Sequence, residues 1–294
     1  MQMEEKDSKV VFSENKEDLL YCPKDFVHYE IPIGIKRIGK DAFADCRSLQ
    51  SVSIPDTVKS IGENAFYHCS SLESVFMPDS ISDIGEHAFD LCTSLRKVRL
   101  SNSIRYIRRE AFRECKSLHS IIIPSTVVEI QEKAFKHCKN MQSVVISESE
   151  QEADSLKTIR YEAFQCCEKL EEIVIPDTVH EIESGTFAGC SSLKRVTVSS
   201  VWMKQKENVV VVERLGKVWF RQNVNVVIYP DSFAGCNNLR EIDFDTELRV
   251  RILSNAFSGS TEIKHVKGRT GMLVYSDDAF VNKDSINFVF EECF

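Results

Sequence analysis

The chain has 294 residues, 43% of them apolar, so it is long enough to bury a substantial core. Its 37 basic and 45 acidic side chains leave a formal net charge of −8, which argues against nucleic-acid binding. No apolar run approaches the roughly 20 residues that a bilayer span requires. The N-terminal stretch also lacks the apolar region of a secretory signal.

Residues 1–28 precede the first copy of an internal repeat. Terminal units of repeat proteins must cover an otherwise exposed core, so we expect residues 1–28 to form an N-terminal cap. Phe26 and Tyr29 lead into the first strand that the sequence predicts.

Residues 29–200 repeat a 23-residue unit. The segment AFADCRSL, which begins at Ala42, returns as AFYHCSSL from Ala65 and as AFDLCTSL from Ala88. A unit of this size cannot bury its apolar face alone, so the period predicts a solenoid of stacked coils. The repeating phenylalanines are Phe43, Phe66, Phe89, Phe112, Phe135, Phe164, Phe187, Phe233, Phe257 and Phe280.

Two elements recur within each unit. Segments such as SVSIP (51–55) alternate β-branched and polar residues and predict a short strand that proline ends. Segments such as GENAFYHC (62–69) place apolar residues at i, i+1 and i+4, which predicts a short helical turn.

Eight cysteines lie three residues after a repeating phenylalanine, and the sequence contains no C-x-x-C pair. This regular spacing is unlike a disulfide framework or a zinc site, so we expect reduced, buried thiols. A serine in place of Cys115 should then destabilise the fold by about 1–3 kcal/mol, because its hydroxyl would lack an assured partner.

The pattern L-x-x-V-x-I-P-x-x-V-x-x-I-G-x-x-A-F-x-x-C closely resembles BspA-type leucine-rich repeats. The resemblance implies an α/β solenoid: a right-handed coil with a parallel β-sheet on one face and short helical turns or loops on the other. It also implies a cell-surface or secreted protein concerned with adhesion or host contact, as family members commonly are in bacteria and parasitic protists.

The repeat is interrupted twice. Residues 147–154, SESEQEAD, carry six residues more than the regular spacing and are acidic, and we expect them to form a solvated loop; a cation site or a contact for a basic partner is the alternative. The phenylalanines on either side of residues 201–230 are 46 residues apart, which is twice the repeat. The sequence therefore predicts that residues 201–230 replace a whole coil with an irregular, hairpin-modified repeat. Trp202 and Trp219 would fill its core or, alternatively, mark a binding site.

Residues 231–294 contain degenerate repeats and, we expect, a C-terminal cap closed by Phe288, Phe290 and Phe294. The whole chain would then form one continuous domain. The sequence leaves the oligomeric state open.

No convergent set of catalytic groups is recognisable, so we expect no catalytic, cofactor-binding or metal-ligating residues and no enzymatic activity.

The positions ten residues after each phenylalanine should face outward from the strands. Five of them form a column in which apolar residues surround an arginine, with Ser51, Ser74, Ser120 and Ser143 at its polar edge. This column predicts a surface for a protein partner, although β-propensity alone could also explain it. Its members are Phe76, Arg99, Ile122, Val145 and Val174.

These features favour a non-enzymatic protein-binding module at the cell surface or outside the cell, through the parallel-sheet face. The alternative is an intracellular protein–protein interaction scaffold, favoured by the absence of a recognisable signal and by the reduced thiols.

Overall fold

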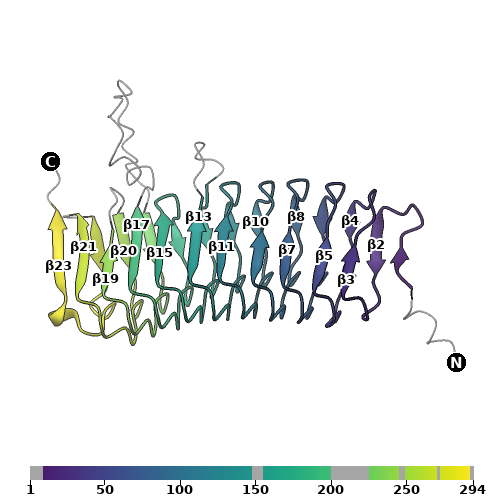
Figure 1. The fold of residues 1–294 in the computed structure, drawn as a ribbon. Coiled ribbons are helices and arrows are strands. Elements are labelled where there is room, and N and C mark those ends of the chain that lie inside the picture. Colours follow the sequence, from purple (N-terminus) through teal and green to yellow (C-terminus); the bar gives the residue numbers. More distant parts are fainter. Residues whose placement is uncertain (1–8, 148–154, 200–224, 245–248, 270–271, 292–294) are drawn as a thin grey trace, which may run out of the picture.

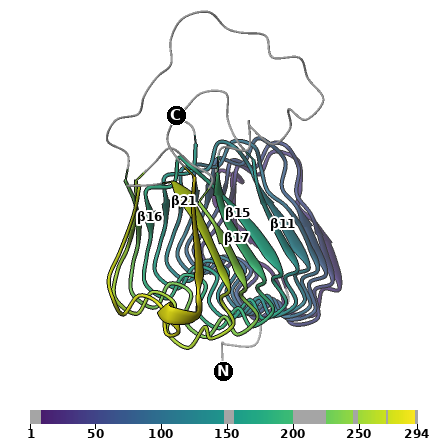
Figure 2. The same ribbon diagram turned by 90° about the vertical axis from the view of Figure 1, so that its left-hand side faces the viewer.

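The structure, a computed structural model, describes residues 9–147, 155–199, 225–244, 249–269 and 272–291. These residues form a row of stacked coils with the N-terminal and C-terminal coils at opposite ends (Figure 1). Each regular coil contributes one strand to a first parallel sheet, one strand to a second parallel sheet and a turn segment. Viewed along the row, β11, β15, β17 and β21 lie on one side of the molecule and β16 on another (Figure 2).

The first sheet is built from the segments that the sequence predicts as strands. Burial alternates along them: in β11 the side chains of Ile121 and Ile123 are inside, whereas Ser120 and Ile122 face solvent. This alternation is the period of two expected when only one face of a strand is buried. The strands are β3 (His28–Glu30), β5 (Ser51–Ser53), β7 (Ser74–Phe76), β9 (Lys97–Arg99), β11 (Ser120–Ile123), β13 (Ser143–Ile146), β15 (Glu172–Pro176), β17 (Arg195–Ser199), β19 (Glu241–Asp243), β21 (His265–Arg269) and β23 (Asn287–Glu291).

The second sheet was not predicted from the sequence. The apolar residue five positions before each phenylalanine, such as Ile61, lies in a short parallel strand whose neighbours are its counterparts in adjacent coils. Pairing satisfies backbone groups that would otherwise be buried without partners. The strands are β2 (Asp18–Tyr21), β4 (Arg37–Ile38), β6 (Ser60–Ile61), β8 (Asp83–Ile84), β10 (Tyr106–Ile107), β12 (Glu129–Ile130), β14 (Thr158–Ile159), β16 (Glu181–Ile182), β18 (Asn225–Ile228), β20 (Arg249–Ile252) and β22 (Leu273–Tyr275).

The prediction of helical turns, and with it the α/β class, is wrong. The only helix in the described ranges is a three-residue 3-10 helix, η2 (Lys283–Ser285). Around Phe66, the residues two before and two after it, Asn64 and His68, have positive φ angles of 52° and 57°, which break a right-handed helix. The N–H of Phe66 donates to the carbonyl of Ala88 in the next coil at 2.8 Å. Backbone hydrogen bonds between coils replace those that a helix would make within its own segment.

The repeating phenylalanines form one continuous stack through the core. Nine successive ring pairs lie nearly parallel, with centroids 4.8–5.4 Å apart and interplanar angles of 2–13°. These distances indicate offset stacking, which the ring quadrupole favours over direct superposition. The prediction that these side chains are the core anchors is confirmed, since each is at most 3% exposed.

The cysteine column runs beside this stack. From Cys69 to Cys236, each thiol of the column donates to the carbonyl of the phenylalanine in the preceding coil, as Cys115 Sγ does to Phe89 O at 3.2 Å. Ser260 stands at the same position in a later coil, and its Oγ donates to Phe233 O at 2.8 Å. A hydroxyl at this position therefore has a partner, and the reason given above for expecting Cys115→Ser to destabilise the fold is wrong.

The 29-residue spacing leaves the coils in register. Phe135 and Phe164 stack at 5.2 Å across it, and β12 pairs with β14. The loop predicted for residues 147–154 lies, apart from Ser147, outside the described residues.

The described coils on either side of the 46-residue spacing are direct neighbours. Phe187 stacks directly on Phe233 at 5.1 Å, β16 pairs with β18, and β17 pairs with β19. No other ring therefore lies between Phe187 and Phe233 in the stack, and the irregular repeat predicted for residues 201–230 stays a prediction. Trp202 and Trp219, and with them most of the predicted hairpin, lie outside the described residues.

Aromatic side chains close both ends of the stack edge-on. At the N-terminal end, Tyr29 meets Phe43 at 66°, and β1 (Val11–Phe12) pairs antiparallel with β2. At the C-terminal end, Tyr275 and Phe288 each meet Phe280 at 81°. Edge-to-face packing ends the stack without presenting another open ring face. Phe290 is 43% exposed, and Phe294 lies outside the described residues.

Candidate binding surface

The five residues of the predicted column lie on consecutive strands of the first sheet, from β7 to β15. The four apolar ones are the large exposed side chains of these strands, at 59% for Phe76, 62% for Ile122, 53% for Val145 and 37% for Val174. Phe76 pairs in register with Arg99, and Ile122 with Val145. The predicted outward orientation is confirmed, whereas binding through these residues stays a prediction. We call these five residues the outer column.

Arg99 is held in place within the outer column. Its Nη1 donates to the carbonyl of Met77 at 2.7 Å, and its Nη2 lies 3.1 Å from Oδ1 of Asp79. The guanidinium is therefore fixed by the segment that directly follows β7, which lowers the entropy that an arginine would lose on binding.

Farther along the same sheet, a polar depression adjoins the outer column. Its charges are largely matched internally, because Arg195 Nη2 lies 2.7 Å from Glu241 Oε2. The depression is lined by Glu172, Lys194, Arg195, Asn238, Arg240 and Glu241.

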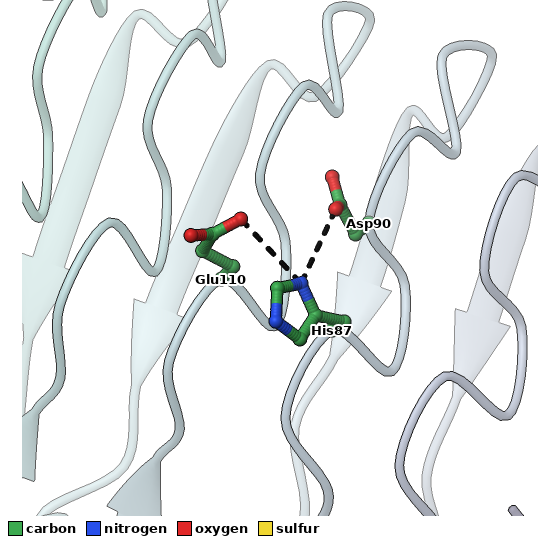
Figure 3. A group of neighbouring side chains, drawn as sticks. All are labelled: His87, Asp90 and Glu110. Atoms are coloured by element: carbon green, nitrogen blue, oxygen red, sulfur yellow. Dashed lines mark hydrogen bonds and ion pairs between the residues drawn. The ribbon is translucent and has the colours of Figure 1, made fainter.

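A second cluster, on the turn side of the solenoid, was missed in the sequence. His87 Nδ1 lies 3.4 Å from both Asp90 Oδ2 and Glu110 Oε2, and these atoms could in principle ligate a metal ion (Figure 3). Asp90 is completely buried, and burial raises the pKa of its carboxyl. Aligning the repeats could have revealed the group, since Glu110 occupies the position of His87 one coil later.

A basic side chain already pairs with both carboxylates of this cluster. Arg113 Nη2 lies 2.7 Å from Asp90 Oδ2, and Arg113 Nε lies 2.7 Å from Glu110 Oε2. A cation would compete with the guanidinium for the same two oxygens. The arrangement is therefore that of an ion-pair network between two coils.

The cysteine thiols are poorly suited to act as nucleophiles at neutral pH. Ten cysteines are described, all unbonded, and nine of them are buried. Desolvation raises the pKa of the Cys46 thiol to about 12 and that of the Cys236 thiol to about 12. A thiol that stays protonated is a weak nucleophile.

Native labelling with a thiol reagent should therefore discriminate sharply among the described cysteines. We expect Cys166, which is half-buried, to be the first of them to react, and Cys115 to react only when the fold opens. Peptide mapping after timed labelling measures each site, and a Cys166→Ser variant is the control. Rapid labelling of Cys115 in the folded protein would contradict the burial of this column.

The repeats match a known protein family over most of the chain. Residues 17–142 and 157–287 match the BspA type leucine rich repeat region, in six copies. The chain belongs to this family. The BspA-type match covers the whole phenylalanine stack and four residues of the outer column, and Val145 lies in the gap between the two matched ranges.

Solved structures of other leucine-rich repeat proteins are similar to this BspA-type chain. One from Eubacterium ventriosum is 26% identical, with a TM-score of 0.57 over 63% of this chain and 49% of that one. A leucine rich cell surface protein from Faecalibacterium prausnitzii is 21% identical, with a TM-score of 0.49 over 97% and 93%. A leucine-rich repeat protein from Bacteroides ovatus is 19% identical, with a TM-score of 0.47 over 97% and 90%. A comparison with curated proteins gave no match.

Within the described residues, no helix has the length and apolar character needed to cross a bilayer.

Proposed function

We propose that this BspA-type repeat protein is a non-enzymatic binding module that holds a protein partner on the outer column. The observation that carries the proposal is the exposure of four large apolar side chains on one face, on strands β7, β11, β13 and β15. The buried residues of these strands already supply the core, so the stability of the fold does not require apolar side chains on the outside. Exposed apolar patches on a rigid surface are typical of interfaces.

The surroundings of the outer column support this proposal. Serine side chains flank it, and Arg99 lies within it, which matches the apolar centre and polar edge of a protein interface. Arginine and aromatic residues are also enriched among the residues that dominate binding energy. Phe76 and Arg99 are adjacent in register and would both take part in such a contact.

Replacing Ile122 and Val145 with aspartate should abolish or strongly weaken partner binding while the fold stays intact. We expect a loss of more than about 1–2 kcal/mol, the scale of a binding hot spot. The measurement is a pull-down from native extract with the parent and the double variant, compared by mass spectrometry, with thermal unfolding as the check on folding.

The matched control places the same charge on the second sheet, in Tyr106→Asp/Thr158→Asp. Tyr106 belongs to the same coil as Ile122 and is also exposed. The control variant should retain the partners of the parent. Identical partner lists for the parent and the Ile122→Asp/Val145→Asp variant would rule out the outer column.

The cellular setting has two candidates. Family membership favours adhesion or host contact at the cell surface, and the reduced thiols favour an intracellular scaffold. Protease treatment of intact cells of the source organism separates the two. Digestion of the protein on intact cells would support the surface setting, and protection until lysis would support the intracellular one.

A further inference from the structure

One junction in the row of coils differs from its neighbours in both sheets. It lies between residues 77–99 and residues 100–123. Strands β6 and β8 pair before it, and β10 and β12 pair after it, but β8 and β10 do not pair. In the first sheet, β7 pairs with β9 and β11 with β13, but β9 and β11 do not pair. Both sheets are therefore interrupted between the same two coils.

The hydrogen bonds of flanking junctions show what is missing in the second sheet. The N–H of Gly85 donates to Ile61 O at 2.7 Å, and the N–H of Gln131 donates to Ile107 O at 2.8 Å. Across the interrupted junction, the described residues contain no equivalent bond from Arg108 to Ile84.

The first sheet shows the same gap. The N–H of Arg96 donates to Glu73 O at 2.8 Å, and the N–H of Gln142 donates to His119 O at 2.7 Å. The equivalent bond from His119 to Arg96 does not occur among these described residues.

The turn side of the same junction is continuous. The N–H groups of His87, Phe89 and Leu91 donate to the carbonyls of Arg109, Ala111 and Arg113 at 3.0, 2.8 and 2.9 Å. The rings of Phe89 and Phe112 stack at 5.3 Å. The coils are therefore joined by backbone bonds along one side and not along the two sheets.

A change of residue type at one repeat position coincides with the gap. Gly39, Gly62 and Gly85 occupy this position in successive coils, and a Cβ on Gly85 would lie only 2.4 Å from backbone atoms of Gly62 and Glu63. The next residue in this series is Arg108. The interrupted junction is therefore the one at which a coil with a Cβ at this position follows a coil with glycine. A Cβ alone does not prevent pairing, because Gln131 stands at this position one coil later and its N–H donates to Ile107 O at 2.8 Å.

Side chains hold the junction closed opposite the turn side. In the loops between the sheets, the N–H of Asn102 donates to Asp79 Oδ1 at 3.0 Å, and Ser103 Oγ donates to Asp79 O at 2.6 Å. Ser101 Oγ donates to Ile81 O at 2.5 Å. The next junction has one such bond, from Thr126 Oγ to Ile104 O at 2.8 Å.

We propose that this junction is a joint in the solenoid, with the turn side as its hinge and the contacts of Asp79 with Asn102 and Ser103 as its latch. When the latch opens, the two sheets separate between β9 and β11 and between β8 and β10. The outer column crosses the joint, with Phe76 and Arg99 on one side and Ile122 and Val145 on the other. Opening therefore changes the distance between these two pairs of residues. The consequence for partner binding rests on the function proposed above.

Hydrogen exchange of the intact protein, followed by mass spectrometry without any partner, tests the joint. Amides at 106–108 and 119–122 should exchange on the order of tenfold faster than those at 129–131 and 142–145, because exchange follows the local free energy of opening. Equal protection of the two sets would overturn the joint. The result does not depend on whether the outer column binds a partner.

Two substitutions test the cause and the latch. Arg108→Gly restores the glycine series and should slow exchange at 106–108, whereas Gln131→Gly, at a junction that is already paired, should not slow exchange at 129–131. Asp79→Ala should accelerate exchange on both sides of the joint, and Thr126→Val should leave the joint unchanged. If Arg108→Gly left the exchange as fast as in the parent, the change of residue type would not be the cause of the gap. If Asp79→Ala had no effect, the latch would be wrong.

Discussion

Replacing Phe112 with alanine should lower the free energy of unfolding by about 3–5 kcal/mol, the usual cost of truncating a buried phenylalanine. The side chain is completely buried, and its ring stacks on Phe89 at 5.3 Å and on Phe135 at 5.4 Å. The substitution opens a cavity in the middle of the stack that adjacent coils can fill only by moving together. Chemical denaturation, followed by circular dichroism, measures the loss.

Phe76→Ala is the matched control, because Phe76 lies on β7 with 59% of its surface exposed. We expect this substitution to cost less than about 1 kcal/mol, as is usual for a surface position. A loss of less than 1 kcal/mol for Phe112→Ala would show that its ring is not a core anchor.

Arg113→Met should destabilise the protein by about 3 kcal/mol near neutral pH, the lower part of the range for removing one partner of a buried ion pair. Methionine retains most of the apolar stem but leaves the carboxylate of Asp90, which is completely buried, without its cation. Glu110 loses its contact with Arg113 at the same time.

The loss should depend on pH in a defined direction. Burial raises the pKa of Asp90 above its ordinary value of 3.8, and Arg113 opposes that rise, so the variant should have a still higher pKa. A carboxyl with a raised folded pKa binds a proton more tightly when folded than when unfolded. Its contribution to stability is fully present below the unfolded pKa and is lost as the pH rises through the folded pKa. The difference between parent and variant should therefore shrink as the solution is acidified from neutral pH toward 4.

Lys194→Met is the control for this effect. Lys194 forms an ion pair with Glu171 in which both side chains are more than half exposed. Such pairs contribute about 0–1 kcal/mol, so this variant should unfold like the parent at every pH. A loss for Arg113→Met that did not vary with pH would contradict the role assigned to the Asp90 carboxylate.

The outer column could be located from the sequence because its geometry is local. Residues that alternate along a strand lie on opposite sides of it, so the burial of Ile121 and Ile123 requires Ile122 to face outward. The cluster of His87, Asp90, Glu110 and Arg113 could not be located by searching for motifs. Its members belong to two coils and meet only after stacking.

The sequence by itself determined the stacked coils, the strands of the first sheet and the buried columns of phenylalanine and cysteine. It could do so because the neighbours of each repeat are copies of that repeat, so a side chain such as Phe112 meets the same residue type on both sides. Side-chain identity and period therefore predict the packing of the core without coordinates.

Only the tertiary structure decided how the backbone is bonded. An N–H such as that of Phe66 can bond within its own segment, as in a helix, or to the next coil, and the carbonyl of Ala88 is available only when the coils are stacked. The second sheet, the turns in place of helices and the direct contact between Phe187 and Phe233 all follow from such bonds and contacts between coils. The interrupted junction could likewise be seen only in the structure, because it is defined by pairing that is absent between β8 and β10 and between β9 and β11.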